Sequence, residues 1–257
     1  ATVRRITLLF MNNTAIIIPT RLAAKRFPNK PLAKINNIPM IVHVMNKAKE
    51  AKVGEVFVAT PDKEISEVVK KFDGQPIMTE NNHTTGSDRV YEAYVKKLQN
   101  KSNIDLIINL QGDMPNIKAD SILKLVKFMR NEKCEIGTLA STINNEHEAN
   151  DKNIVKVEVS DILESNTFLK VKDFFRSKKN FDIKKTYHHI GIYAFTNDAL
   201  TKYVKLSKTK LEIERNLEQM RALENNMLLK VGFCDSTPLS VDTEEDFKKI
   251  TKEMNPV

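Results

Sequence analysis

Residues 15–32 read "AIIIPTRLAAKRFPNKPL". The opening run, "AIIIP" (15–19), is apolar and β-branched, which is typical of a buried strand. The loop that follows carries four cations: Arg21, Lys25, Arg26 and Lys30. Pro28 and Pro31 flank Lys30 and stiffen the loop, which lowers the entropy lost when that lysine is held in place. The stretch therefore predicts a strand that ends in a cationic, restrained loop.

The chain on either side repeats this strand-then-helix rhythm. We expect strands at 15–19, 55–60, 76–79, 104–113 and 136–142. We expect helices at 39–54, 62–72, 87–99 and 118–132. Ser87 is the expected cap of the third helix. Strands that alternate with helices at this spacing predict an α/β fold with a mostly parallel central sheet.

The rhythm changes after about residue 145. Segments 153–161 and 187–195 resemble strands, and residues 168–185 between them have weak periodicity. A helix at 211–226, a strand at 228–235 and a helix at 243–254 capped by Thr243 complete the pattern. We interpret 11–257 as one domain with a β-rich insertion at about 150–195. We interpret residues 1–10 as a leader or a non-native remnant before Met11, and a native N-terminal strand is the alternative.

Composition narrows the class of protein. The chain has 257 residues, is 41% hydrophobic and carries a net charge of +8, so it can bury a core. Its cations are interleaved with 33 acids and it has no Trp, which disfavours nucleic-acid binding. Cys134 and Cys234 fit no disulfide framework, and no run is long enough to insert in a membrane, so we expect a cytoplasmic protein.

The glycines bear on how phosphate could be bound. None of the seven forms a P-loop or a G-x-G-x-x-G fingerprint. If phosphate binds, side-chain cations must supply the charge, and the loop at 20–32 lies where open α/β sheets bind ligands. By charge count alone the loop would be a solvated segment, and its prolines favour the binding role.

Two aspartates follow predicted strands. Asp113 lies in "NLQGDMP" (109–115) and Asp242 in "SVDTEED" (240–246). Each could simply turn the chain or cap a helix. Together they suit Mg²⁺, which takes few protein carboxylates and completes its octahedron with phosphate oxygens and water.

Three of these stretches resemble one family. Residues 16–32 resemble P-A-R-x-x-S-x-R-x-P-x-K-P-L, "HTTGSDR" (83–89) resembles H-x-S-G-T-[DE]-R, and "NLQGDMP" resembles N-x-Q-G-D-E-P. "NIVKVEV", "HHIGIYAF", "LEQMR" and "VDTEEDF" follow in the same order as in that family. The set, over residues 14–253, is similar to the 3-deoxy-manno-octulosonate (Kdo) cytidylyltransferases, also called CMP-Kdo synthetases.

The resemblance implies a Rossmann-like nucleotidyltransferase fold of the nucleotide-diphospho-sugar transferase type, whose insertion serves sugar binding and dimerisation. It implies a magnesium-dependent homodimer that converts CTP and Kdo to CMP-Kdo and pyrophosphate for lipopolysaccharide synthesis. On the nucleotide and metal side it implies catalytic and binding roles for Thr20, Arg21, Arg26, Lys30, Ser87, Gln111, Asp113 and Asp242. On the sugar side it implies Gln111, Arg176, His189, Tyr193, Glu218 and Gln219.

The chain departs from the family pattern at three places. Met114 replaces the glutamate of G-D-E-P, Arg215 replaces an acid, and Phe175-Arg176-Ser177 differs from the family's S-R segment. Because both aspartates remain, we expect an active enzyme.

Strand alternation puts His188 and His189 on opposite faces, and without the resemblance either ring would be interpreted as a core histidine.

Other functions compete with this interpretation. An enzyme of the same fold could activate sialic acid or an amino-Kdo, and a glycosyltransferase could also use an aspartate-held metal. A basic nucleic-acid-binding module is a non-enzymatic alternative, which would show salt-sensitive binding.

Overall fold

The computed structural model of the chain describes residues 13–23, 26–100 and 103–255. They form two compact units, Ala1–Leu123 with Pro238–Val257 and Lys124–Thr237. The expected leader at 1–10 and the cation Lys25 lie outside the described residues. The single domain at 11–257 with an insertion near 150–195 stays a prediction.

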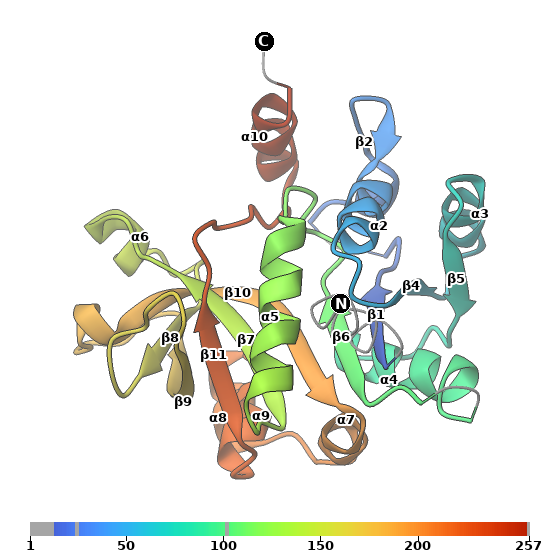
Figure 1. Cartoon of the computed structure of the whole chain (residues 1–257). Helices are drawn as coiled ribbons and strands as arrows, with labels where there is room; N and C mark the ends of the chain where they lie inside the picture. The colour runs from blue at the N-terminus through green and yellow to red at the C-terminus, as the bar shows by residue number, and fades with distance from the viewer. Residues whose placement is uncertain (1–12, 24–25, 101–102, 256–257) are drawn as a thin grey trace, which may run out of the picture. The chain divides into compact units, whose positions relative to one another are not determined.

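The first unit contains strands that pair in parallel in the order β5-β4-β1-β6 (Figure 1). The bounds are β1 Thr14–Pro19, β4 Glu55–Thr60, β5 Gln75–Met78 and β6 Leu106–Leu110. Ile16 of β1 pairs with Val56 on one side and Ile108 on the other, and every residue of β1 is buried. These four predicted strands are confirmed, and parallel pairing puts their carboxyl ends at one edge.

Three helices pack against this sheet. They are α2 Met40–Glu50, α3 Lys63–Lys71 and α4 Gly86–Lys97. Helix α2 contacts β4, α3 contacts β4 and β5, and α4 contacts all four strands. Each helix buries the apolar face that its periodicity predicts, as Ile41, Val44 and Met45 do in α2. The predicted helices are confirmed: α2 and α3 are shorter at both ends, and α4 begins one residue earlier and ends two residues earlier than predicted.

The cap of α4 differs from the prediction. Thr85, in an extended conformation, accepts a hydrogen bond from the backbone N–H of Asp88, so it is the N-cap. Ser87 lies inside the first turn, is buried, and has its Oγ 3.5 Å from Asn109 Nδ2. The prediction was wrong because "TTGS" offers several hydroxyls and the helix begins one residue earlier than expected.

The C-terminal segment packs on the chain that follows the cationic loop. That chain forms a 3₁₀ turn, η1 Lys30–Leu32, and a hairpin of β2 Lys34–Ile35 and β3 Ile38–Pro39. Helix α10, Glu244–Glu253, closes the first unit, and Thr243 caps it through a capping box with Asp246, as predicted. A core cluster of Ile35, Met40, Val241 and Ile250 joins the two ends of the chain.

The second unit is built from five mostly antiparallel strands. They pair in the order β10-β7-β11-β9-β8, and β8 also pairs with β10, so the strands form a closed ring. The bounds are β7 Ile136–Ser141, β8 Lys156–Val159, β9 Phe168–Phe175, β10 Thr186–Thr196 and β11 Leu229–Phe233. Strand β9 falls where the sequence showed only weak periodicity, because its buried residues, Phe168, Val171, Phe174 and Phe175, do not alternate regularly with its exposed ones.

The remaining helices are short, apart from α5, and the boundary between the two units at residues 123 and 124 falls within α5. They are α5 Ala119–Asn131, α6 Glu146–Asn150, α7 Asn197–Val204, α8 Lys210–Arg215 and α9 Met220–Glu224, with a 3₁₀ turn η2 Ile183–Lys185. Within the described ranges, no helix has both the length and the apolar character that a membrane crossing requires.

The continuous helix predicted at 211–226 is wrong. Asn216 adopts the left-handed conformation (φ 51°, ψ 48°) and ends α8. Asparagine tolerates this conformation and often ends helices in this way. Helix α9 then starts afresh after Gln219, so Glu218 and Gln219 lie in the connection between two helices.

Gly54, at the entry to β4, should tolerate no side chain. A Cβ there would lie 1.9 Å from the carbonyl oxygen of Thr14, so Gly54→Ala forces two backbone segments apart. We expect a loss of about 3 kcal/mol in the free energy of unfolding, measured by urea denaturation. Gly86→Ala is the control, because its Cβ would meet only ordinary contacts at 3.4 Å and beyond. Equal stability of the two variants would contradict this account.

Candidate active site

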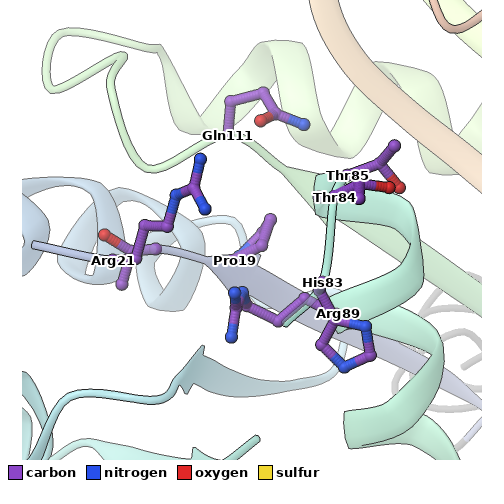
Figure 2. A pocket seen from close by; sticks show the side chains of 9 residues that line it. Pro19, Arg21, His83, Thr84, Thr85, Arg89 and Gln111 are labelled. Carbon is purple, nitrogen blue, oxygen red and sulfur yellow. The ribbon is translucent and has the colours of Figure 1, made fainter. Parts of the chain in front are cut away.

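A pocket opens at the carboxyl edge of the parallel sheet in the first unit. The loops after β1, β5 and β6 and the first turn of α4 surround it (Figure 2). Its lining is Pro19, Thr20, Arg21, His83, Thr84, Thr85, Gly86, Arg89 and Gln111. This edge is where open α/β sheets bind ligands, and the amino end of α4 adds partial positive charge.

Two arginines contribute most of the charge of this pocket. Arg89 is 3% exposed, and its Nη1 donates to Thr79 Oγ1 at 2.6 Å and to the Glu80 carbonyl at 2.9 Å. Burial, and then the charge of Arg21, lower the pKa of Arg89. Two like charges that interact across a pocket are stabilised by an anion between them, so the lining favours an anionic ligand.

A carboxylate holds the neighbouring loop in place. Glu92 of α4 accepts hydrogen bonds from the backbone of Glu80 and from His83 and forms an ion pair with Lys96. Burial opposes its ionisation, but the bonds from Lys96, His83 and Glu80 outweigh burial and lower the pKa of Glu92 to about 2. Glu92 thereby fixes the loop that brings His83 to the pocket.

The end of β6 packs closely against the first loop, and this packing positions Gln111 and Thr20. Gln111 Nε2 donates to Asn109 Oδ1 at 3.0 Å, and the Thr20 N–H donates to the Ala59 carbonyl at 3.0 Å. A Cβ on Gly112 would lie 3.3 Å from the Pro19 carbonyl oxygen, so this glycine lets β6 end close against the first loop. The predicted residue Ser87 does not line the pocket but packs behind it, on Asn109.

Lys30 brings the two predicted metal-binding aspartates together. Its Nζ donates to the Val241 carbonyl at 2.6 Å and lies 3.7 Å from Asp113 Oδ2 and 3.8 Å from Asp242 Oδ1. The Lys30 side chain is only 15% exposed. The two carboxylates, 129 positions apart by subtraction of their residue numbers, therefore converge on one cationic centre.

The surroundings of the two carboxylates differ. Burial raises the pKa of Asp113, the charge of Lys30 opposes this, and the charge of Asp242 adds to it. Asp242 is 46% exposed and also pairs with Arg26 at 3.3 Å. The backbone holds both in place, because Val241 N–H donates to the Asp113 carbonyl and Asp242 N–H donates to Asp246 Oδ2. A further cation would relieve the repulsion between these two acids.

In the second unit, three of the residues predicted for the sugar lie together. His189 is 9% exposed, and its ring packs against Phe174 at 5.0 Å and Tyr193 at 5.5 Å. Burial, and then the charge of His188, lower the pKa of His189 to about 3. Burial, and then the charge of Glu218, raise the pKa of Tyr193. His188 turns away to pair with Glu148 at 2.7 Å, which agrees with the expected alternation.

A buried ion pair supports Glu218 and Gln219. Arg221 Nε donates to Glu212 Oε2 at 2.9 Å, its Nη2 donates to Glu212 Oε1 at 2.5 Å, and the two side chains are 4% and 7% exposed. Removing one partner of such a pair costs roughly 3–5 kcal/mol, because the other charge stays buried. Arg221 also stacks over Tyr203, whose hydroxyl donates to the Glu218 carbonyl at 2.8 Å. The helix connection is thus held rigidly.

Arg176 is not brought to this cluster by any contact within the described part of the chain. Its Nη1 donates to the Asn153 carbonyl at 2.8 Å, and its own carbonyl accepts from Lys156 Nζ at 2.8 Å. Lys156 is fully buried and also donates to the carbonyls of Asp151 and Ile154. The lysine therefore fixes the backbone around Arg176.

The two substitutions in the family pattern have local explanations. Met114 is 3% exposed and contributes to the core. Burying an unpaired acid at this position would cost free energy. Arg215 forms an ion pair with Asp173 and donates to the Phe174 carbonyl at 2.6 Å. Asp173 thus offsets the reversed charge at position 215.

Sequence reasoning missed four residues of this site. His83 and Arg89 belong to "HTTGSDR", so the motif that suggested Ser87 could have indicated them. Glu212 and Arg221 were not among the predicted site residues, although Arg221 ends the quoted segment "LEQMR". Only the break at Asn216, which has no strong sequence signal, brings these two together.

Burial of His189 should appear in the pH dependence of stability. The unfolded chain takes up a proton on this histidine near pH 6.5, and the folded chain only near pH 3. The contribution to stability is therefore complete above pH 6.5 and is lost as the pH falls toward 3, at about 1.4 kcal/mol per pH unit. We expect urea unfolding from pH 7 to 4.5 to show that the free energy of unfolding falls more steeply in wild type than in His189→Gln. The difference between the two proteins should change by about this slope. Parallel pH profiles would contradict the assignment.

Comparisons with known proteins identify the family. The pattern of the cytidylyltransferase family matches residues 15–231. The chain is 39% identical to the 3-deoxy-manno-octulosonate cytidylyltransferase of Bartonella tribocorum, over 92% of this chain and 96% of that protein. It is 41% identical to the protein of the same name from Rhodopseudomonas palustris, over 91% and 95%.

Solved structures extend the comparison to the fold. A CMP:2-keto-3-deoxy-manno-octonic acid synthetase complexed with CTP superposes with a TM-score of 0.84 at 33% identity, over 94% of this chain and 98% of that one. A 4-diphosphocytidyl-2C-methyl-D-erythritol synthase from Anaerococcus prevotii, at 14% identity and a TM-score of 0.64 over 95% and 98%, shares the fold alone. The fold is thus the mixed α/β fold of nucleotidyltransferases, and the chain belongs to the 3-deoxy-manno-octulosonate cytidylyltransferase family.

Proposed function

We propose that the chain catalyses the transfer of CMP from CTP to Kdo, with release of pyrophosphate, for lipopolysaccharide synthesis. The observation that carries this proposal is the meeting of Lys30, Asp113 and Asp242 beside a pocket that contains Arg21 and Arg89. Family membership supports the reaction, since the structurally similar synthetase was solved with CTP bound.

The nucleotide is assigned to the pocket of the first unit. The backbone near Thr20, with Ser87 and Gln111, would contact the cytidine. Arg21 and Lys30 would hold the phosphates, and the exposed Arg26 would add charge at the rim. The amino end of α4, which needs no glycine-rich loop, would supply further positive potential.

We propose that Asp113 and Asp242 hold a divalent cation. Both carboxylates already lie within 4 Å of one Nζ, and hard carboxylate oxygens are the ligands that Mg²⁺ prefers. No group of three or more His, Cys, Asp or Glu side chains suited to a metal occurs among the described residues. Mg²⁺ held by few carboxylates completes its shell with phosphate and water, so two aspartates suit a metal that binds with CTP.

In the proposed reaction the anomeric hydroxyl of Kdo attacks the α-phosphorus of CTP, and pyrophosphate leaves in line. Mg²⁺ on Asp113 and Asp242 would polarise the α-phosphate. Arg21 and Lys30 would neutralise the charge that grows on pyrophosphate. The protein would otherwise only hold both substrates in position, because phosphoryl transfer requires little covalent chemistry from protein groups.

The sugar acid is assigned to His189, Tyr193, Glu218 and Gln219 of the second unit, with Arg176 at the end of β9 and Gln111 on the nucleotide side. We propose a Rossmann-like nucleotidyltransferase fold in which residues 150–195 serve sugar binding and dimerisation. A magnesium-dependent homodimer in the cytoplasm completes the proposal.

Pyrophosphate release with CTP and a panel of sugar acids tests the reaction. Kdo should be turned over faster than sialic acid or an 8-amino-Kdo, and no pyrophosphate should form without a sugar acid. A preference for another acid of the panel would show that the chain activates that sugar acid and not Kdo. Turnover of a nucleotide sugar but not of free CTP would indicate a glycosyltransferase instead.

Neutralising either aspartate tests the metal site. We expect Asp113→Asn and Asp242→Asn each to lower kcat by about 10²–10³, because a preorganised charge contact to the transition state is lost. Excess Mg²⁺ should not restore the rate, whereas chelation with EDTA should abolish wild-type turnover. Glu245→Gln, an exposed acid of the same helix start, should leave kcat unchanged. Near-normal kcat in both aspartate variants would refute the two-aspartate site.

A further inference from the structure

Thr138 lies opposite an irregularity in strand β10. The pairing of β10 with β7 runs from His189–Ala140 to Ile190–Leu139 and then shifts to Tyr193–Thr138. Two residues of β10, Gly191 and Ile192, are therefore extra, as in a β-bulge. The Thr138 side chain faces this point and is fully buried.

Three groups surround the hydroxyl of Thr138. Its Oγ1 lies 2.7 Å from the Ile192 carbonyl, 3.2 Å from the Ile190 carbonyl and 2.9 Å from His189 Nε2. Carbonyl oxygens only accept hydrogen bonds, and a threonine hydroxyl has one proton to donate. The proton therefore points to the carbonyls, and the oxygen can only accept from the imidazole. Nε2 must carry a hydrogen.

The protonation state of Nδ1 follows from that of Nε2. Burial, and then the charge of His188, lower the pKa of His189 to about 3, so the ring is neutral near pH 7. A neutral imidazole has one N–H, so Nδ1 bears a lone pair. Within the described ranges Nδ1 has no hydrogen-bonding partner, while Phe174 and Tyr193 fix the ring plane.

We propose that Thr138 is a positioning residue that locks His189 in the Nε2–H tautomer and leaves Nδ1 to accept a hydrogen bond from a hydroxyl of the sugar acid. The inference rests on the proposed function, which assigns His189 to that substrate. An acceptor held in this way selects a hydroxyl donor at its position, because a substrate without one would leave Nδ1 desolvated and unpaired.

The tautomer can be read directly by long-range ¹H–¹⁵N NMR of the ¹⁵N-histidine-labelled chain, with His189→Gln to assign the signals. Wild type and Thr138→Ser should show a protonated Nε2 and an unprotonated Nδ1. Thr138→Val, which keeps the shape but loses the hydroxyl, should populate the other tautomer. The KM for Kdo should rise roughly tenfold in Thr138→Val and stay within about twofold in Thr138→Ser, with the KM for CTP unchanged in both.

Each outcome bears on a different step. A protonated Nδ1 in the wild type, which needs no variant to fold, would overturn the inference, and so would an unchanged tautomer in Thr138→Val. If the tautomer shifts as expected but Thr138→Val and His189→Ala both keep the wild-type KM for Kdo, Thr138 still orients the ring. The assignment of His189 to the sugar acid is then wrong, and the proposed role of Nδ1 falls with it.

Discussion

The ammonium group of Lys30 is the contact on which the candidate active site depends. It joins the loop after the first strand to the Val241 carbonyl, 211 positions away, and holds Asp113 and Asp242 within 4 Å. Without a cation between them, the two carboxylates, of which Asp113 is partly buried, would repel each other. In the proposed reaction, a metal ion that arrives with CTP would take over this neutralisation and release Lys30 to the phosphates. One lysine would then support the site before binding and act on the substrate afterwards.

The pocket of the first unit has oriented cations in place of a glycine-rich loop, because hydrogen bonds hold them in position. Arg89 is fixed by Thr79 and the Glu80 carbonyl, so its guanidinium faces the pocket before any ligand arrives. Leu22 N–H donates to Asp62 Oδ2 at 2.7 Å and so restrains the loop directly after Arg21. Such preorganisation lowers the entropy cost of binding. The second unit is preorganised in the same way, since Thr138 orients His189. The Glu212–Arg221 ion pair holds the connection that carries Glu218.

Local signals made much of this structure predictable. The β-branched run at 15–19 and the capping box at Thr243 depend on neighbouring residues alone, and both are confirmed. Features that depend on distant partners were not predictable. Strand β9 exists because β8 and β11 flank it, and the helix break at Asn216 rests on one residue's conformation. For the cationic loop, the sequence indicated that its positive charges have a role, but not which cation contacts which group. Arg21 lines the pocket, Arg26 and Lys30 face the aspartates, and Lys25 is outside the described residues.

The central claim is that this loop holds the triphosphate. Calorimetric titration of CTP and of cytidine into wild type and Lys30→Met, with Mg²⁺ present, measures it most directly. The account predicts that the variant binds CTP at least about tenfold more weakly, since a charged contact worth about 1.4 kcal/mol or more is lost, and binds cytidine with unchanged affinity. Equal CTP affinity in the two proteins would contradict it.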